Sequence, residues 1–176
     1  MDISKNYFEV FGLPVAFDVD QAQLVERYRE LQREIHPDRF AGAGDREQRL
    51  AVQYATYVNE AFEALKSPLL RAEYLLKLQG VALAPANQTT SDATFLMRQM
   101  ELREELSEVK DQPDPEAALD ALSEHVAQAM TELQNRFADH YRAADFEAGK
   151  QVVSKLHFIV KLAHEVEQLE AEILDY

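Results

Sequence analysis

Residues 28–40 read Tyr-Arg-Glu-Leu-Gln-Arg-Glu-Ile-His-Pro-Asp-Arg-Phe, and they carry the strongest signal for fold in the chain. Together with the residues just before them they have helical spacing, because apolar side chains recur every three or four positions on one face. That face consists of Leu24, Tyr28, Leu31 and Ile35. The residue before a proline is pushed out of helical geometry. We therefore expect this helix to begin at a cap, Asp18 or Asp20, and to end before Pro37.

Further helices are predicted on either side of this one. A short helix is expected over 4–11, with Ser4 as its cap, and another over 68–79. A longer helix is expected over 45–66, with Asp45 as its cap. Its apolar face would comprise Leu50, Tyr54, Tyr57, Val58, Ala61, Phe62 and Leu65.

The second half of the chain is predicted to be a three-helix bundle. Glycine, prolines and a Thr-Thr-Ser run make residues 80–91 a linker. Amphipathic helices are then expected over 92–110, 115–143 and 145–174. Because short connections between long helices produce antiparallel neighbours, these helices should pack against one another.

The composition fits an all-α protein with two domains, 1–79 and 92–176. Only 5 glycines and 6 prolines interrupt 176 residues, and 47% of the residues are hydrophobic, too many for a disordered chain. The net charge of −14 argues against binding to a nucleic-acid backbone. The absence of cysteine excludes disulfides, thiol catalysis and thiolate-held metal centres. No apolar run approaches the roughly 20 residues of a membrane span, so we expect a cytoplasmic protein.

The His-Pro-Asp triplet at 36–38 gains significance from its position between two amphipathic helices. Taken alone, the triplet is a weak signal, because Asp38 could cap a turn on which His36 packs. In its context, however, residues 5–70 resemble a J-domain. The resemblance rests on Tyr7-Phe8, Gly12-Leu13-Pro14, Tyr28-Arg29-Glu30-Leu31, His36-Pro37-Asp38-Arg39-Phe40 and Val58-Asn59-Glu60-Ala61-Phe62.

This resemblance implies a function. J-domains dock on a DnaK-type chaperone and stimulate its ATP hydrolysis, using the His-Pro-Asp loop and the basic face of the second helix. The matching residues here are His36, Pro37, Asp38, Arg27, Arg29, Arg33 and Arg39. Glutamates alternate with these arginines and can pair with them along the helix, for a few tenths of a kcal/mol each. The face is therefore less basic than the family pattern, and the triplet weighs more than any single arginine.

The helix predicted over 92–110 has two apolar faces. At about 100° per residue, its core stripe consists of Phe95, Gln99, Leu102, Leu106 and Val109. The opposite face consists of Leu96, Met97, Met100, Glu101, Glu104 and Glu108. Adaptable apolar side chains beside carboxylates suit a docking surface. A second interpretation stays open on geometry alone: Leu96 and Met97 could contact the linker or the J-domain, with the glutamates solvated.

A second resemblance covers essentially the whole chain. Residues 94–106, Thr-Phe-Leu-Met-Arg-Gln-Met-Glu-Leu-Arg-Glu-Glu-Leu, and residues 71–76, Arg-Ala-Glu-Tyr-Leu-Leu, are similar to the HscB family of iron–sulfur co-chaperones. It implies an L-shaped molecule that binds the scaffold protein IscU and delivers it to the chaperone HscA. The family's scaffold-binding positions fall on Leu96, Met97, Met100, Glu101, Glu104, Glu108 and Phe158. Met100 stands where leucine is common, a swap that nearly conserves volume.

These patterns predict a non-enzymatic co-chaperone that acts as a monomer, activates an ATPase, and needs neither a cofactor nor a metal ion. One alternative is a J-domain adaptor for a different client, which a binding measurement with purified scaffold would distinguish. Another alternative is a small hydrolase that uses His36 and Asp38 as an acid–base pair. The sequence near them lacks a nucleophile, a glycine-rich phosphate loop and a cluster of metal ligands.

Overall fold

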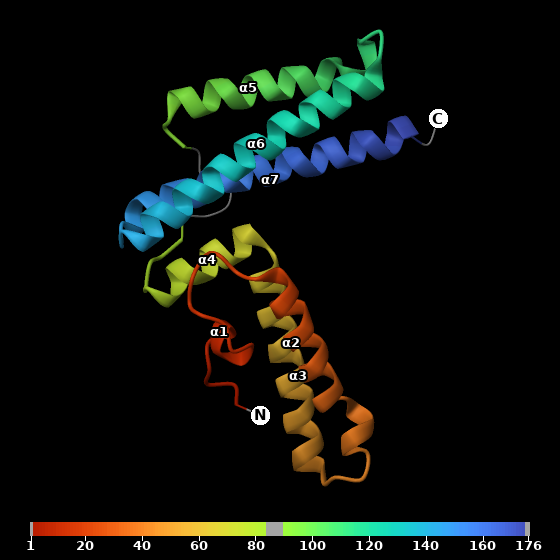
Figure 1. The fold of residues 1–176 in the computed structure, drawn as a ribbon, viewed down its shortest axis with the longest axis vertical. Coiled ribbons are helices and arrows are strands. Elements are labelled where there is room, and N and C mark those ends of the chain that lie inside the picture. Colours follow the sequence, from red (N-terminus) through yellow and green to blue (C-terminus); the bar gives the residue numbers. More distant parts are fainter. Residues whose placement is uncertain (1, 84–89, 175–176) are drawn as a thin grey trace. The chain divides into compact units, whose positions relative to one another are not determined.

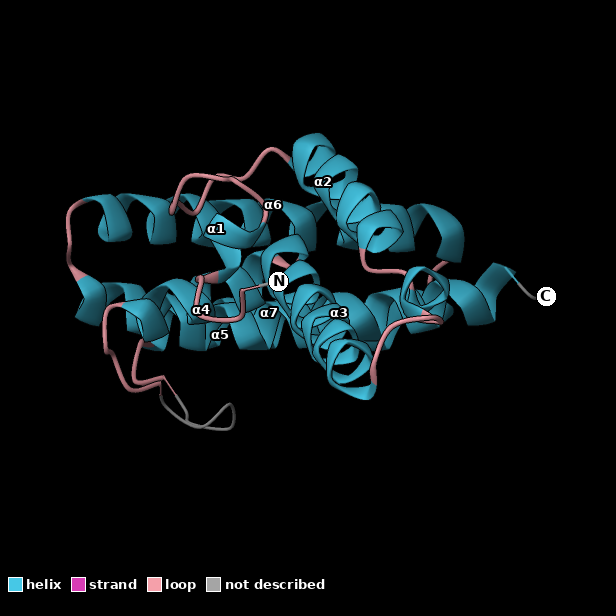
Figure 2. Ribbon diagram, turned by 90° about the horizontal axis from the view of Figure 1, so that it is seen from below, coloured by secondary structure: helices cyan, strands magenta, loops and turns pink. Residues whose placement is uncertain are grey.

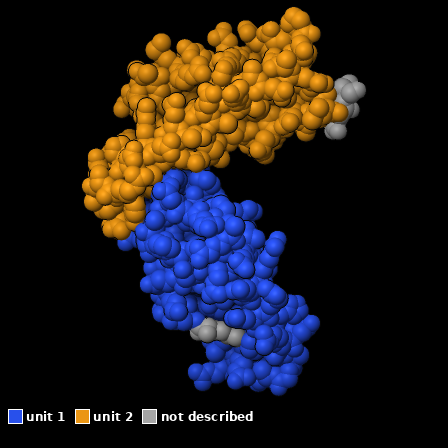
Figure 3. All heavy atoms as spheres, viewed as in Figure 1, with its two compact units in different colours: residues 1–78 blue, residues 79–176 orange. Residues whose placement is uncertain are grey.

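The computed structural model describes residues 2–83 and 90–174. The chain divides into two compact units, Met1–Leu78 and Gln79–Tyr176, which Figure 3 colours separately. The described residues form helices and loops without any strand, as Figure 2 shows, and the all-α prediction is confirmed. The predicted linker over 80–91 falls largely on residues 84–89, which lie outside the described part of the chain.

The first unit is built on two helices that lie side by side, α2 (Gln21–Glu34) and α3 (Asp45–Lys66) (Figure 1). The ring of Tyr28 stacks on that of Phe62, with centroids 3.9 Å apart. The Tyr28 hydroxyl also donates a hydrogen bond to the side-chain oxygen of Asn59 at 2.9 Å. Aromatic stacking and a hydrogen bond thus join the middle of α2 to α3.

Two shorter helices, α1 (Tyr7–Val10) and α4 (Pro68–Leu78), pack against α3. The largest fully buried side chains of this unit are Phe8, Phe11, Leu24, Leu65, Leu75 and Leu76. Arg71 is buried as well; its Nη1 donates to the Leu65 carbonyl oxygen at 2.9 Å, and its guanidinium lies 4.9 Å from the ring centroid of Phe17. Burial lowers the pKa of the Arg71 side chain. This unit therefore has its own apolar core.

Two of the predicted helix caps are corrected by the structure. Asn6, not Ser4, caps α1, because its side chain accepts a hydrogen bond from the Glu9 N–H while the Glu9 carboxylate accepts one from the Asn6 N–H. This reciprocal pair satisfies two backbone donors at once. Gly44 precedes α3 without a side-chain cap, and Asp45 is the first residue of the helix.

Two further predictions in this unit also differ from the structure. The loop expected after α2 contains a turn of 3₁₀ helix, η1 (Pro37–Phe40). Pro37 is its first residue, a position where the missing N–H of proline has no helical partner to lose. Leu50 was expected on the apolar face of α3 but is 46% exposed. It lies at the start of that stripe, whereas Val58, Ala61 and Leu65 are fully buried.

The second unit is a bundle of three helices: α5 (Ala93–Glu108), α6 (Pro115–Arg142) and α7 (Phe146–Leu174). Helices α6 and α7 pack along their length, and α5 packs against both (Figure 1). The chain leaves α5 through a short 3₁₀ turn, η2 (Val109–Asp111), so the helix expected over 92–110 changes geometry at Val109. The largest fully buried side chains here are Leu102, Leu122, Phe137, Leu156, Ile159 and Leu162.

Candidate functional site

The His-Pro-Asp segment has a defined local geometry after the end of α2. His36 is the N-cap of η1, and the Asp38 backbone N–H donates a hydrogen bond to His36 Nδ1 at 3.3 Å. The neutral ring then carries its proton on Nε2. The Asp38 carboxylate lies 3.5 Å from His36 Nδ1, and the two side chains are 60% and 91% exposed. Asp38 therefore does not act as the turn cap, and its carboxylate faces solvent.

An open groove adjoins this segment within the first unit. It has a volume of about 840 Å³. Its lining residues are Arg29, Gln32, Arg33, Ile35, His36, Ala55 and Asn59. Ile35 and Ala55 give it an apolar part, and two guanidinium groups give it positive charge. The structure thus brings Arg29 and Arg33 of α2 to the same groove as His36.

The four predicted arginines differ in their contacts. Arg27 forms an ion pair with Glu30, one helical turn along α2, as the alternating charges suggested. Arg39 donates to the Arg33 carbonyl oxygen at 3.5 Å. Neither Arg29 nor Arg33 forms an ion pair with another residue in the described part of the chain. Arg33 Nε, like Arg39, donates to a backbone carbonyl oxygen, that of Arg29 at 3.3 Å, so the charges of Arg29, Arg33 and Arg39 are all more available to a partner than that of Arg27.

The second candidate surface lies on α5, and we call it the docking patch: Leu96, Met97, Met100, Glu101, Glu104 and Glu108. Met97 and Met100 are 64% and 71% exposed. On the opposite face of the same helix, Gln99 and Leu102 are buried. The exposure of the methionines agrees with the helical spacing, whereas Leu96 is half-buried and lies at the edge of the patch.

Phe158 of α7, the remaining predicted docking residue, is half-buried. Its ring meets that of Phe95 edge to face, with centroids 6.1 Å apart and an interplanar angle of 67°. This contact places Phe158 beside Phe95 in the first turn of α5, and Phe95 directly precedes Leu96 in the sequence. Part of the ring remains accessible, so the aromatic edge can extend the apolar part of the docking patch.

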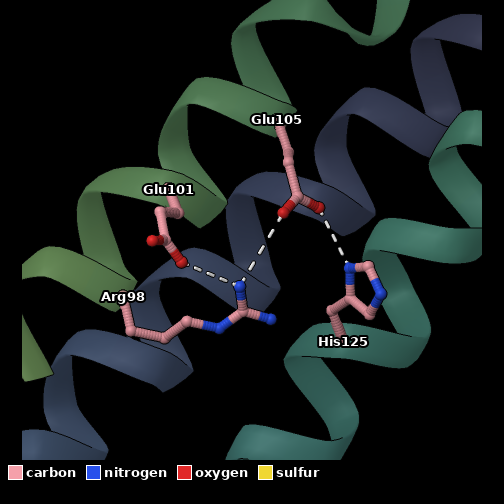
Figure 4. Close-up of polar contacts among 4 residues, drawn as sticks. All are labelled: Arg98, Glu101, Glu105 and His125. Atoms are coloured by element: carbon pink, nitrogen blue, oxygen red, sulfur yellow. Dashed lines mark hydrogen bonds and ion pairs between the residues drawn. The ribbon is translucent and has the colours of Figure 1, made fainter.

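The glutamates of the docking patch are held to different degrees. Figure 4 shows Arg98 between two carboxylates: its Nη1 lies 3.0 Å from Glu101 and 4.0 Å from Glu105. Glu105 in turn lies 3.0 Å from His125 Nδ1 on α6. Glu104 and Glu108 are exposed and form no ion pair with the residues that the structure describes. Arg98 therefore partly neutralises one edge of the patch and leaves the other negative.

The first turn of α5 is fixed to α7 by a charged contact. Asp92 caps α5, since one carboxylate oxygen accepts the Phe95 N–H at 3.0 Å while the other lies 2.5 Å from Lys155 Nζ. The Lys155 ammonium also lies 5.6 Å from the centroid of the Phe95 ring. The hydrogen bond from Lys155, followed by that from the Phe95 N–H, lowers the pKa of Asp92. This contact holds the helix that presents the docking patch.

Reasoning from sequence missed Arg98, Lys155 and the role of Asp92. Arg98 had a detectable signal, because Glu101 follows it by three positions, a spacing that brings side chains together on a helix. Lys155 had none, because it is 63 residues away from Asp92. Gln99 was assigned to the core stripe; it is indeed buried, and neither atom of its carboxamide has a hydrogen-bond partner among the described residues.

Within residues 2–83 and 90–174, no group of three or more His, Asp or Glu side chains could hold a metal ion. In the same ranges, no helix has both the length and the apolar character that crossing a membrane requires.

Comparison with known proteins places the chain in a family. Residues 91–167 match the family model described as the HSCB C-terminal oligomerisation domain. A co-chaperone protein HscB homolog of Shewanella halifaxensis is 42% identical over 174 residues, covering 97% of this chain and 99% of the relative. A homolog of the same description from Vibrio cholerae is 44% identical over 169 residues, with coverage of 96% and 99%.

Solved structures agree with these sequence matches. The structure of the chaperone HscB from Vibrio cholerae superposes with a TM-score of 0.86 at 43% identity, covering 96% of this chain and 99% of that one. The crystal structure of human co-chaperone protein HscB gives a TM-score of 0.87 at 29% identity, covering 97% and 84%. The first unit is accordingly a J-domain and the second a C-terminal three-helix bundle, and the chain belongs to the HscB family of co-chaperones.

Proposed function

We propose that this chain carries the iron–sulfur scaffold protein IscU to the DnaK-type chaperone HscA and stimulates ATP hydrolysis by HscA. It does so in the cytoplasm as a monomer. The chaperone contact comprises His36, Pro37, Asp38, Arg27, Arg29, Arg33 and Arg39, and the scaffold contact comprises the docking patch with Phe158.

The observation that best supports the proposal is the exposure of Met97 and Met100 on a helix whose other face is buried. Solvent-exposed methionines with carboxylates around them are typical of an adaptable docking surface rather than of a core. Support for the chaperone contact comes from Asp38, whose side chain is 91% exposed beside a groove lined by Arg29 and Arg33.

The mechanism that follows is one of linked binding, not of chemistry on the co-chaperone itself. One chain that holds the scaffold on its second unit and the ATPase on its first raises the effective concentration of each partner for the other. The His36 and Asp38 groups can then rearrange ionic and hydrogen-bond contacts on the ATPase. ATP hydrolysis is thereby coupled to the arrival of the scaffold.

The test is the ATPase rate of HscA, measured alone, with this protein, and with this protein and IscU together. We expect stimulation by the protein and further stimulation when IscU is added. Asp38→Asn should abolish the stimulation without lowering the free energy of unfolding, because an exposed side chain is replaced by one of the same shape. Asp45→Asn, which removes an exposed carboxylate at the start of α3, is the matched control and should stimulate normally.

Two results would contradict the proposal in different ways. Full stimulation by Asp38→Asn would remove the role of the His-Pro-Asp segment. If the wild-type protein stimulates HscA but does not bind IscU, the J-domain part of the proposal stands and the client is a different protein.

A further inference from the structure

Met97 and Met100 occupy a distinctive chemical environment. The chain has 4 methionines. Met97 and Met100 are 64% and 71% exposed, whereas Met130 on α6 is half-buried, and Met1 lies outside the described residues. A thioether in water is open to attack by peroxides, and oxidation converts a flexible apolar side chain into a polar one. The two most exposed methionines among the described residues thus lie together on one face of α5.

We propose that Met97 and Met100 are a peroxide-sensitive modification site that switches off scaffold binding; the proposal rests on the proposed function of the docking patch. A sulfur lone pair attacks one oxygen of hydrogen peroxide, the O–O bond breaks, and an S–O bond forms. The sulfur is oxidised by two electrons, the peroxide is reduced, and its second oxygen leaves as water. Methionine sulfoxide reductases reverse the change.

The consequence for binding follows from the composition of the docking patch. Its apolar part consists chiefly of these two side chains, and the glutamates around it already supply polar contacts. A sulfoxide oxygen buried at an apolar contact without a donor is unfavourable. The neighbouring carboxylates of Glu101 and Glu104 accept hydrogen bonds and cannot donate to it. Two sulfoxides should therefore weaken binding to IscU by about tenfold or more.

The experiment begins with the chemistry alone. The full-length protein is treated with hydrogen peroxide, and the oxygen gained by each methionine is followed by peptide mass mapping over time. We expect Met97 and Met100 to gain one oxygen each before Met130 does. Earlier oxidation of Met130 would overturn the proposal, whatever the partner of the chain.

The second measurement is the affinity for IscU after the peroxide has been removed. We expect binding by the wild-type protein to weaken and to recover after treatment with methionine sulfoxide reductases. The control is Met97→Leu/Met100→Leu, which keeps the apolar volume but cannot form a sulfoxide, and it should bind equally before and after peroxide. Equal weakening of this control would place the effect elsewhere and overturn the proposal.

An alanine variant separates failure of the switch from failure of the proposed function. If sulfoxides form at both positions and binding is unchanged, the switch is wrong. If untreated Met97→Ala/Met100→Ala then binds IscU weakly, the docking patch still stands. If that variant binds normally, the docking patch itself has failed.

Discussion

At the scale of single residues, a few polar contacts set the geometry of both candidate surfaces. His36 accepts the Asp38 N–H and so closes the turn itself, which leaves the Asp38 carboxylate for a partner. Asp92 uses both carboxylate oxygens, one for the first turn of α5 and the other for Lys155. The hydrogen bond at His36 thus shapes the turn that exposes Asp38, and the two hydrogen bonds at Asp92 fix the start of α5 to α7.

The lowered pKa of Asp92 predicts a dependence of stability on pH. A carboxyl group whose folded pKa lies below its unfolded value, about 3.9, stabilises the fold above that value. That contribution is lost as the pH falls through the lower, folded pKa. The thermal unfolding temperature of wild type should therefore fall more steeply below about pH 4 than that of Asp92→Asn.

Thermal unfolding of both proteins between pH 7 and pH 3 tests this prediction. Asparagine is also a good N-cap, so Asp92→Asn keeps the contact to the Phe95 N–H and loses the charge together with the oxygen that accepts from Lys155. Lys155→Met removes the other partner of the same contact, so at neutral pH it should lower the thermal unfolding temperature as Asp92→Asn does. Parallel curves for wild type and both variants would show that the Asp92–Lys155 contact does not stabilise the bundle.

At the scale of elements, α5 divides its apolar residues between two opposed uses. Leu102 is fully buried against the other helices, whereas Met97 and Met100 face solvent. The helix is held by the cap at Asp92, by the Glu105–His125 contact to α6, and by the ion pair of Arg103 with Glu165 of α7 at 2.8 Å. These contacts reach α6 and α7 and leave the patch face uncovered within the second unit.

This division predicts opposite effects for two substitutions on one helix. Leu102→Ala should lower the free energy of unfolding by about 2–5 kcal/mol, because it leaves a cavity in the core. Met97→Ala/Met100→Ala should change it by less than about 0.5 kcal/mol per site. The second variant should nevertheless weaken IscU binding more than Glu104→Gln/Glu108→Gln, because desolvated apolar groups carry most interface energy.

Denaturant unfolding and a binding titration on the same three variants check both statements. If the methionine variant loses as much stability as Leu102→Ala, its side chains belong to the core. If the glutamate variant binds more weakly than the methionine variant, charge carries the interface.

At the scale of the whole molecule, charge is distributed unevenly along the chain. The net charge is −14, yet the groove beside His36 carries Arg29 and Arg33 without ion pairs to the other described residues. Residues 1–76 contain 9 basic and 13 acidic side chains, and residues 77–176 contain 9 and 19. A local cationic groove on an acidic protein favours one orientation of approach to an acidic partner.

Binding to HscA should consequently weaken as salt is added, since exposed charges are screened beyond about 10 Å at 0.1 M. Arg29→Ala/Arg33→Ala should weaken binding at low salt and flatten its salt dependence. Arg136→Ala, which removes an exposed cation from α6, should leave both unchanged. Affinity measured from 0.05 to 0.5 M salt tests this, and a wild-type affinity independent of salt would assign the contact to apolar groups.

Local patterns in the sequence were enough to predict the helices, the place where α2 ends, and the two faces of α5. The reason is that helical spacing and the geometry before proline act over a few residues, so one stretch contains the whole cause. The His-Pro-Asp segment was recognisable for the same reason. The cap of α1 was predicted wrongly, because several polar side chains within a few positions could cap the helix and their contacts decided that Asn6 does so. The exposure of Leu50 was also predicted wrongly, because helical spacing does not show where along α3 the apolar stripe begins to be covered.

Contacts between distant residues could not be read from those patterns. Asp92 meets Lys155 across 63 residues, Glu105 meets His125 across 20, and Phe95 meets Phe158 from another helix. Each pair exists because the three helices pack in one register, and register depends on the volumes of all the core side chains together. The amino-acid pattern therefore determined which face of α5 is buried and which is exposed. The packing of the bundle determined which side chains hold that face in place, and which remain free to meet a partner.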